Sequence, residues 1–314
     1  MFFQNVLTAS EQVAILYILV AIGAIADKAG IYTEKVAKSC TDLLFYIITP
    51  AVIIKSFCTL EYNPQTAKSL FVAILCGFIL HVVSGAISSV VFNKCNKDEA
   101  CIYKYSCAYG NCGYMALPLA QAVLGDEGVF YCSAVVISFQ VFSFTHGIYT
   151  ITKGKDGEKV KFDIKKLLLN PGVISVIVGL PFFLLSVKLP VIIDSPLNYI
   201  ASLNTPVAML IFGTYIANTN FKSIFKNWRI FAVAFVKLIV LPLVLIAGFR
   251  LSGITGTLLA ALAISAGAPT ANNTVMFAAK YDRNTGLASQ TVAVVSFISI
   301  ITLPVMIALA QAVG

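Results

Sequence analysis

A helix-breaking sequence, Ala268-Pro269-Thr270-Ala271-Asn272-Asn273, lies in the middle of an apolar segment that is long enough to cross a membrane. A second one, Gly110-Asn111-Cys112-Gly113, lies in the middle of an earlier apolar segment. Non-helical backbone at membrane depth is tolerated only where protein or a water-filled cavity surrounds it. Two such breaks at corresponding positions of two halves are the pattern expected for the substrate site of a carrier. The pair therefore indicates a membrane protein with a polar site near its centre.

The composition is that of a protein embedded in a membrane. Hydrophobic residues make up 59% and charged residues 11% of the 314 residues, whereas soluble domains have roughly 45–50% and about 25%. The mean hydropathy of +0.89 excludes the two soluble domains that the length alone would permit. The formal net charge of +8 comes from basic residues in short gaps between apolar runs, without the clustered patches that nucleic-acid binding needs. The expected partner is therefore the lipid bilayer and not nucleic acid.

No residue pattern in the chain predicts a metal or cofactor site. All eight cysteines lie between Cys40 and Cys132, without a CxxC pair or a Cys/His cluster with zinc spacing. Most of them fall inside apolar runs, where cysteine behaves as a small hydrophobic residue. The N-terminus has no basic region and no small-residue cleavage site, so the first apolar run is expected to stay in the mature protein.

The apolar segments predict an all-α polytopic membrane protein with ten spanning helices. A spanning helix needs about 20 mostly apolar residues. The candidate segments are 8–26, 39–59, 69–92, 102–123, 128–150, 167–187, 195–217, 229–249, 255–279 and 286–312. The longest connection, from Lys153 to Lys166, is polar and basic. We therefore expect a first five-helix half at 1–152, a linker loop at 153–166 and a second five-helix half at 167–314.

The distribution of basic residues predicts the orientation of the chain. Seventeen lysines and arginines, from Lys28 to Arg283, fall in alternate connections on one side, and the other side has only Lys68, Lys188 and Arg250. Basic residues accumulate in cytoplasmic loops. Both termini are therefore expected outside the cell and the central basic loop in the cytosol, in a multi-pass protein of the plasma membrane.

The two halves of the chain repeat weakly but in register. A shift of 156 residues places Gly23 on Gly179, Thr49-Pro50 on Thr205-Pro206, and His81 on Lys237. Farther along, an offset of about 159 residues places Gly110-Asn111 on Pro269-Thr270. Because five is an odd number, the second half must enter the membrane with opposite polarity. The result is an inverted repeat, the architecture that permits alternating access around a central site.

The breaks in segments four and nine supply the chemistry of the predicted site. Proline removes a backbone donor, glycine lowers the cost of irregular geometry, and the expected break residues are Gly110, Asn111, Pro118 and Pro269. In segment nine, one half-helix is expected to end at 265–269 and the next to begin at Thr270. A half-helix that starts after a break presents free N–H groups and a partial charge of roughly +0.5, which can hold an anion. The predicted substrate-binding residues at the breaks are Asn111, Cys112, Gly113, Pro269, Thr270, Ala271 and Asn272, with Asn273 beside them.

Other polar groups lie inside the apolar segments. An ionisable side chain at membrane depth is a candidate for function. Lys237 and His81, at equivalent positions of the repeat, are candidates for gating or coupling, with ion pairing, snorkelling or a hydrogen-bonded core position as alternatives. Asp42 is a candidate for coupling or for a helix-end role near the start of segment two. In segment five, Gln140 and Thr145 are expected to line a cavity, and His146 is a further cavity-lining or gating candidate.

The chain resembles the auxin efflux carrier family, which includes the plant PIN-formed auxin carriers and prokaryotic relatives. The motifs that carry the resemblance, over about residues 8–312, are 111–119 (NCGYMALPL), 170–172 (NPG), 205–210 (TPVAML) and 268–274 (APTANNT). The resemblance implies helices four and nine crossing at the centre, a scaffold bundle, a moving bundle, a homodimer and an anionic substrate at the crossing. It also implies that Asn111 contacts the substrate. Gly110 stands where the plant carriers have proline.

These observations predict a secondary or facilitative carrier of small organic anions, such as carboxylates or auxin-like indole acids. No carboxylate stands at either break, and no Walker motif for ATP is present. One alternative is a sodium-coupled relative of bile-acid or arsenite carriers, and another is a non-transporting receptor or scaffold. An intramembrane enzyme would need a nucleophile and base or metal ligands, which His81 and His146 alone do not supply. We therefore do not expect an enzyme.

Overall fold

The computed structural model describes residues 2–153, 169–218 and 227–314. These residues form helices, and within them no β-strand occurs apart from one isolated antiparallel bridge between Gly110 and Thr270. The first part of the chain forms α1 (Phe2–Lys28), α2 (Glu34–Leu43), η1 (Leu44–Ile48), α3 (Thr49–Thr59), α4 (Pro64–Val91), α5 (Lys97–Ala108), η2 (Cys112–Ala116), α6 (Leu117–Phe142), η3 (Ser143–Gly147) and α7 (Ile148–Thr152). The second part forms α9 (Pro171–Leu184), α10 (Val191–Ser202), α11 (Asn204–Ala217), α13 (Trp228–Phe235), η4 (Val236–Val240), α14 (Leu241–Leu251), α15 (Gly256–Gly267), α16 (Asn273–Lys280) and α17 (Thr285–Val313).

Six helices or helix runs in the described ranges are long and apolar enough to cross a membrane. They are Lys35–Thr59, Pro64–Val91, Cys112–Thr152, Val191–Ala217, Trp228–Leu251 and Thr285–Val313, and shorter apolar helices lie at Pro171–Leu184 and Gly256–Gly267. The predicted all-helical membrane fold is thus present. The linker predicted at 153–166 lies outside the described residues except for Lys153.

The predicted boundary between segments 102–123 and 128–150 falls within α6. Two helices meet there at Gly125, whose φ of 66° and ψ of −155° are not helical. Glycine adopts this positive φ without a steric penalty. The connection in the predicted gap is therefore a tight kink.

Asparagine side chains start several of these helices. An N-cap side chain accepts a hydrogen bond from one of the first helical amides, which have no partner within the helix. The capping residues are Asn63 for α4, Asn96 for α5, Asn170 for α9, Asn227 for α13 and Asn284 for α17. Because an N-cap needs a polar residue directly before the apolar run, these asparagines fix where each helix begins.

Short π-helical turns, labelled η, precede three prolines within long helices. η1 ends two residues before Pro50, η2 two residues before Pro118, and η4 two residues before Pro242. Proline has no N–H and its ring clashes with the carbonyl four residues earlier. A wider turn before the proline relieves that clash, and such turns frequently occur at functional sites.

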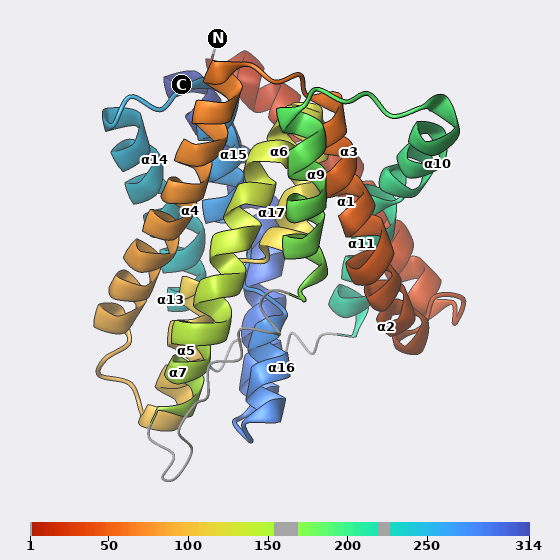
Figure 1. Ribbon diagram of the computed structural model, residues 1–314. Coiled ribbons are helices and arrows are strands. Elements are labelled where there is room, and N and C mark those ends of the chain that lie inside the picture. The colour runs from red at the N-terminus through yellow and green to blue at the C-terminus, as the bar shows by residue number, and fades with distance from the viewer. Residues whose placement is uncertain (1, 154–168, 219–226) are drawn as a thin grey trace.

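The helices form two groups that pack along one another. The first group, α1, α2, η1, α3, α9, α10 and α11, lies to the right in Figure 1, and the second contains α4 to α7 and α13 to α17. Within the first group, a Cβ on Gly23 of α1 would stand 2.4 Å from the Leu210 carbonyl oxygen of α11. A Cβ on Gly179 of α9 would stand 2.9 Å from the Phe57 Cβ of α3. Glycine therefore permits both of these close helix contacts.

Candidate functional site

The two broken segments cross and are joined by their main chains. The Asn111 amide donates a hydrogen bond to the Pro269 carbonyl oxygen at 2.6 Å, and the Ala271 amide donates one to the Tyr109 carbonyl oxygen at 3.0 Å. These two bonds form the antiparallel bridge between Gly110 and Thr270. Proline cannot donate and helix ends leave carbonyls unpaired. The crossing therefore satisfies backbone groups that each break alone would leave without a partner.

The first break occupies three residues. α5 ends at Ala108 and η2 begins at Cys112. The Asn111 side chain accepts a hydrogen bond from the Tyr114 amide at 3.1 Å and so caps η2. Cys112 is buried, and Pro118 lies at the start of α6. The predicted break residues Gly110 and Asn111 thus lie at the crossing, and Pro118 lies two turns beyond it.

The second break is longer than predicted. α15 ends at Gly267 and α16 begins at Asn273, so the half-helix does not start at Thr270 as expected. Thr270 lies in the extended bridge instead, because its main chain pairs with the first break. Its buried hydroxyl donates a hydrogen bond to the Ser106 carbonyl oxygen of α5 at 2.8 Å. The side chain of Thr270 therefore holds the second break against the first.

Unpaired amides gather at the starts of the two half-helices. Among the hydrogen bonds of the described residues, no protein acceptor is present for the amides of Gly113, Asn272 and Asn273. A Cβ on Gly113 would meet no heavy atom of the described residues within 4 Å, so space lies beside the start of η2. Free N–H groups at helix N-termini, with their partial positive charge, are suited to an anion.

Lys237 reaches the crossing from η4. Its side chain is 0% exposed, and its Nζ donates a hydrogen bond to the Ala266 carbonyl oxygen near the end of α15 at 3.2 Å. A Cβ on Gly110 would lie 3.0 Å from the same Nζ. Within the described part of the chain, no carboxylate forms an ion pair with Lys237.

An aromatic cluster lies beside the first break and joins two of the predicted polar residues. The Tyr109 hydroxyl lies 2.7 Å from His146 Nδ1 and also donates to the Phe142 carbonyl oxygen. The His81 ring stacks on Tyr109, with 6.0 Å between the ring centroids, and its Nδ1 lies 2.7 Å from the Gly77 carbonyl oxygen. His81 Nε2 is buried with no partner among the described residues. Tyr109 was not among the predicted site residues, although its place directly before Gly110 was a usable signal.

The remaining predicted residues lie in helices around this centre. The Thr145 hydroxyl donates to the Val141 carbonyl oxygen of its own helix at 2.6 Å, and Gln140 is buried with an Oε1 that has no partner among the described residues. Asp42 is exposed on α2, which begins at Glu34 and not near 39 as expected. Asp42 therefore lies inside the helix run and does not cap its start.

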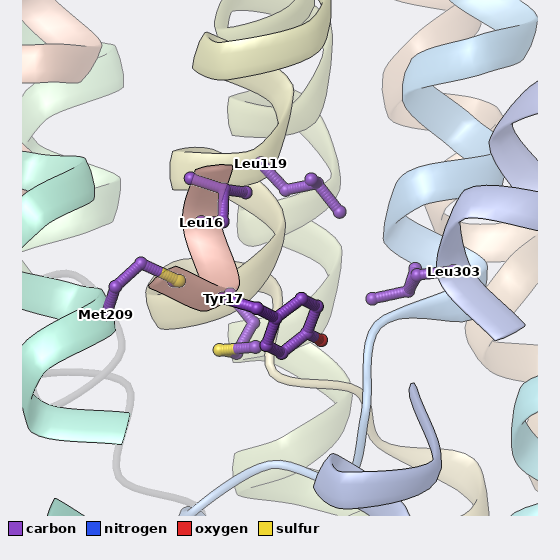
Figure 2. A pocket seen from close by; sticks show the side chains of 6 residues that line it. Leu16, Tyr17, Leu119, Met209 and Leu303 are labelled. Atoms are coloured by element: carbon purple, nitrogen blue, oxygen red, sulfur yellow. The ribbon is translucent and has the colours of Figure 1, made fainter. Parts of the chain in front are cut away.

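A small apolar pocket lies between the two helix groups. Leu16 and Tyr17 of α1 and Met209 of α11 line one side of it, and Met115, Leu119 and Leu303 line the other. Figure 2 shows the side chains around this space. Its volume of about 10 Å³ holds about one water molecule. Met115 belongs to η2, so the half-helix that starts after the first break forms part of the pocket wall.

Comparison with known proteins identifies the family. Residues 8–307 match the family described as membrane transport protein. The chain is also 24% identical over 303 residues to an uncharacterized transporter of Methanocaldococcus jannaschii, an alignment that covers 93% of this chain and 96% of that protein. This family is one of transporters and not of enzymes, and the match extends across both broken segments. The chain therefore belongs to the membrane transport protein family, that of the auxin efflux carriers whose motifs it carries.

Proposed function

We propose that this protein carries small organic anions across the membrane as a secondary or facilitative transporter. The observation that supports this most is the set of unpaired amides of Gly113, Asn272 and Asn273 beside the crossing, next to open space at Gly113. Such amides bind a carboxylate even where no arginine side chain pairs with it. Asn111 retains its side-chain NH₂ group as a donor, because its Oδ1 accepts from Tyr114. Carboxylates and auxin-like indole acids fit this donor set.

The proposed architecture is two inverted five-helix repeats. Three pairs of features support it. Gly23 and Gly179, related by the shift of 156 residues, both permit a close helix contact in the first group. His81 and Lys237, related by the same shift, are both buried near the crossing. The N- and C-terminal ends lie at one end of the molecule in Figure 1, as an even number of crossings requires.

The position of the apolar pocket supports alternating access. The pocket lies on the boundary between the first helix group and the second, and its volume of about 10 Å³ is too small for an organic anion. The Thr205 hydroxyl of α11 donates to the Pro118 carbonyl oxygen across the same boundary at 3.3 Å. We infer that the first group is the scaffold and that the second moves against it, which opens the boundary and exposes the crossing to one side at a time.

The membrane placement and assembly are part of the same proposal. The termini face outward and the central basic loop faces the cytosol of a plasma membrane, as the distribution of basic residues predicts. α10 has no buried residue, and Val191, Ile192 and Tyr199 are exposed on it. This apolar face belongs to the scaffold group and suits a homodimer contact in the bilayer. Mass measurement of the detergent-solubilised protein tests this assembly.

The test of the function is electrical measurement on a solid-supported membrane. Reconstituted wild-type protein is challenged with monocarboxylates, dicarboxylates and indole-3-acetate, with and without sodium and proton gradients. We expect a current from one anion class. In Asn111→Ala the transport current should fall about tenfold or more, because a hydrogen bond to a charged group contributes roughly 1.5–3 kcal/mol.

Two outcomes would decide against parts of this proposal. If no anion of the panel produces a current or stabilises the protein thermally, the receptor or scaffold alternative is favoured. A current that requires sodium would favour the sodium-coupled alternative. Asn218→Ala is the control, because Asn218 contacts Asp27 and the Thr214 carbonyl oxygen at the end of α11, within the scaffold group.

A further inference from the structure

Lys237 has a buried amine with no carboxylate partner among the described residues. The side chain is fully buried in η4, and none of the described acidic residues pairs with it. Removing a charge from water is costly unless nearby groups compensate it. The compensating groups must therefore be found among the backbone dipoles around Nζ.

The C-terminal end of α15 provides the direct part of that compensation, and the end of α5 lies beside it. Nζ donates to the Ala266 carbonyl oxygen, one residue before α15 ends at Gly267. Nζ also lies beside Gly110, two residues after α5 ends at Ala108. The C-terminus of a helix is the negative end of its dipole. The Lys237 amine therefore lies where the negative ends of two helix dipoles converge.

We propose that the Lys237 ammonium is a resident cation, covalently attached, at the position where a coupling cation would otherwise bind. In carriers with broken helices, unwound carbonyls and half-helix C-termini coordinate the coupling ion. Here the chain's own side chain occupies such a position, while the amide ends at Gly113 and Asn272 stay free for the anion. Transport of the anion then needs no sodium at the crossing.

The alternative role for Lys237 is direct pairing with the substrate carboxylate. The two roles predict opposite effects of its removal in protein without substrate. If Lys237 pairs with the substrate carboxylate, it is an uncompensated buried charge in the substrate-free protein. An apolar replacement should then leave the melting temperature unchanged or raise it. A resident cation balances two helix ends, so the same replacement should lower the melting temperature.

The first experiment measures thermal unfolding of substrate-free protein in detergent for wild type, Lys237→Met, Lys237→Arg and the control Lys280→Met. Lys280 is an exposed lysine of α16. We expect the methionine variant at position 237 to melt roughly 2 °C or more below wild type, the arginine variant to lose less, and the control to lose nothing. If the methionine variant cannot be purified but the arginine variant can, that outcome also supports the proposal. A methionine variant that melts at or above the wild-type temperature overturns the proposal.

The second experiment uses the wild-type protein alone and rests on the proposed function. Anion currents are compared in sodium and in N-methylglucamine, and we expect the two to agree within about twofold, because a ligand without differential binding shifts no equilibrium. A requirement for sodium overturns the resident-cation role. If no anion produces a current, the proposed function fails, but the thermal experiment still decides the role of Lys237.

Discussion

The two breaks share one pair of main-chain hydrogen bonds but are completed in different ways. At the first break, the Asn111 side chain caps η2, and within the described ranges no heavy atom lies within 4 Å of a Cβ placed on Gly113. At the second, the Thr270 hydroxyl is fully buried and donates to the Ser106 carbonyl oxygen. The first break therefore has open space and the Asn111 side-chain NH₂ group left over. The second also has unpaired amides, at Asn272 and Asn273, but it uses its hydroxyl to hold the crossing together.

The residues packed around the two breaks also differ, and the second break is again the more tightly enclosed. The half-helix before the second break, α15, is buried from Leu258 to Gly267 and consists of small and aliphatic residues. The first break adjoins the aromatic cluster of Tyr109, His81 and His146, in which His81 Nε2 has no partner among the described residues. This difference teaches that one break can act as a rigid reference while the other recognises the ligand. It makes Asn111 and Gly113 better candidates for substrate contact than the Thr270 side chain.

The largest effect is expected from Gly110→Ala. The added Cβ would lie 3.0 Å from Lys237 Nζ and 3.1 Å from the Ala268 carbonyl oxygen. Overpacking of this kind costs typically 1–3 kcal/mol, and here it separates the two main chains at their bridge. We expect lost transport and a lower melting temperature, measured by anion current and thermal unfolding.

Gly113→Ala is the matched control for that variant. It adds the same methyl group three residues later, where no atom of the part of the chain that the structure describes lies within 4 Å. We expect normal thermal stability but weaker substrate affinity, because the methyl group occupies space beside the free amides. Equal loss of stability in both variants would contradict the proposed difference between Gly110, where a Cβ meets close neighbours, and Gly113, where it meets open space.

Thr270→Val is expected to have an intermediate effect. Valine keeps the shape of threonine but removes the donor to the Ser106 carbonyl oxygen. A side-chain hydrogen bond inside a membrane protein contributes about 1 kcal/mol, so the melting temperature should fall. Substrate affinity should change less than in Asn111→Ala, because only the main chain of Thr270 remains near the anion. A large loss of affinity with unchanged stability would place the hydroxyl on the substrate and reverse the comparison.

The sequence predicted the parts of this structure that depend on local residue chemistry. Long apolar runs gave the helices, and Gly110 and Pro269 located both breaks, because each residue limits helix geometry by itself. The start of α16 was misplaced by three residues, since Thr270 is held in the bridge by a partner far away in the sequence. Asp42 was misplaced for a simpler reason. The first turns of α2 are polar, so the search for apolar segments did not include them.

The contacts at the site could not be predicted, because they join elements distant in the chain. Lys237 was a candidate from its charge alone, but its contact with the Ala266 carbonyl oxygen depends on how η4 lies against α15. The pairing of Tyr109 with His146 likewise depends on the packing of α5 against η3. One local signal was missed. Three of the π-helical turns hold predicted site residues, and two of these turns, η2 and η4, stand before a proline.

The smallest effect is expected from Tyr109→Phe. Phenylalanine keeps the ring that stacks on His81 but removes the hydroxyl that pairs with His146 Nδ1 and the Phe142 carbonyl oxygen. We expect a cost under about 1 kcal/mol and faster amide hydrogen exchange confined to peptides that cover 109–117. Tyr103→Phe is the control, because its hydroxyl pairs with Asn227 at 2.7 Å and not with the crossing. If exchange also rose in peptides that cover 268–277, the two breaks would loosen together, and the second could no longer serve as a rigid reference for the first.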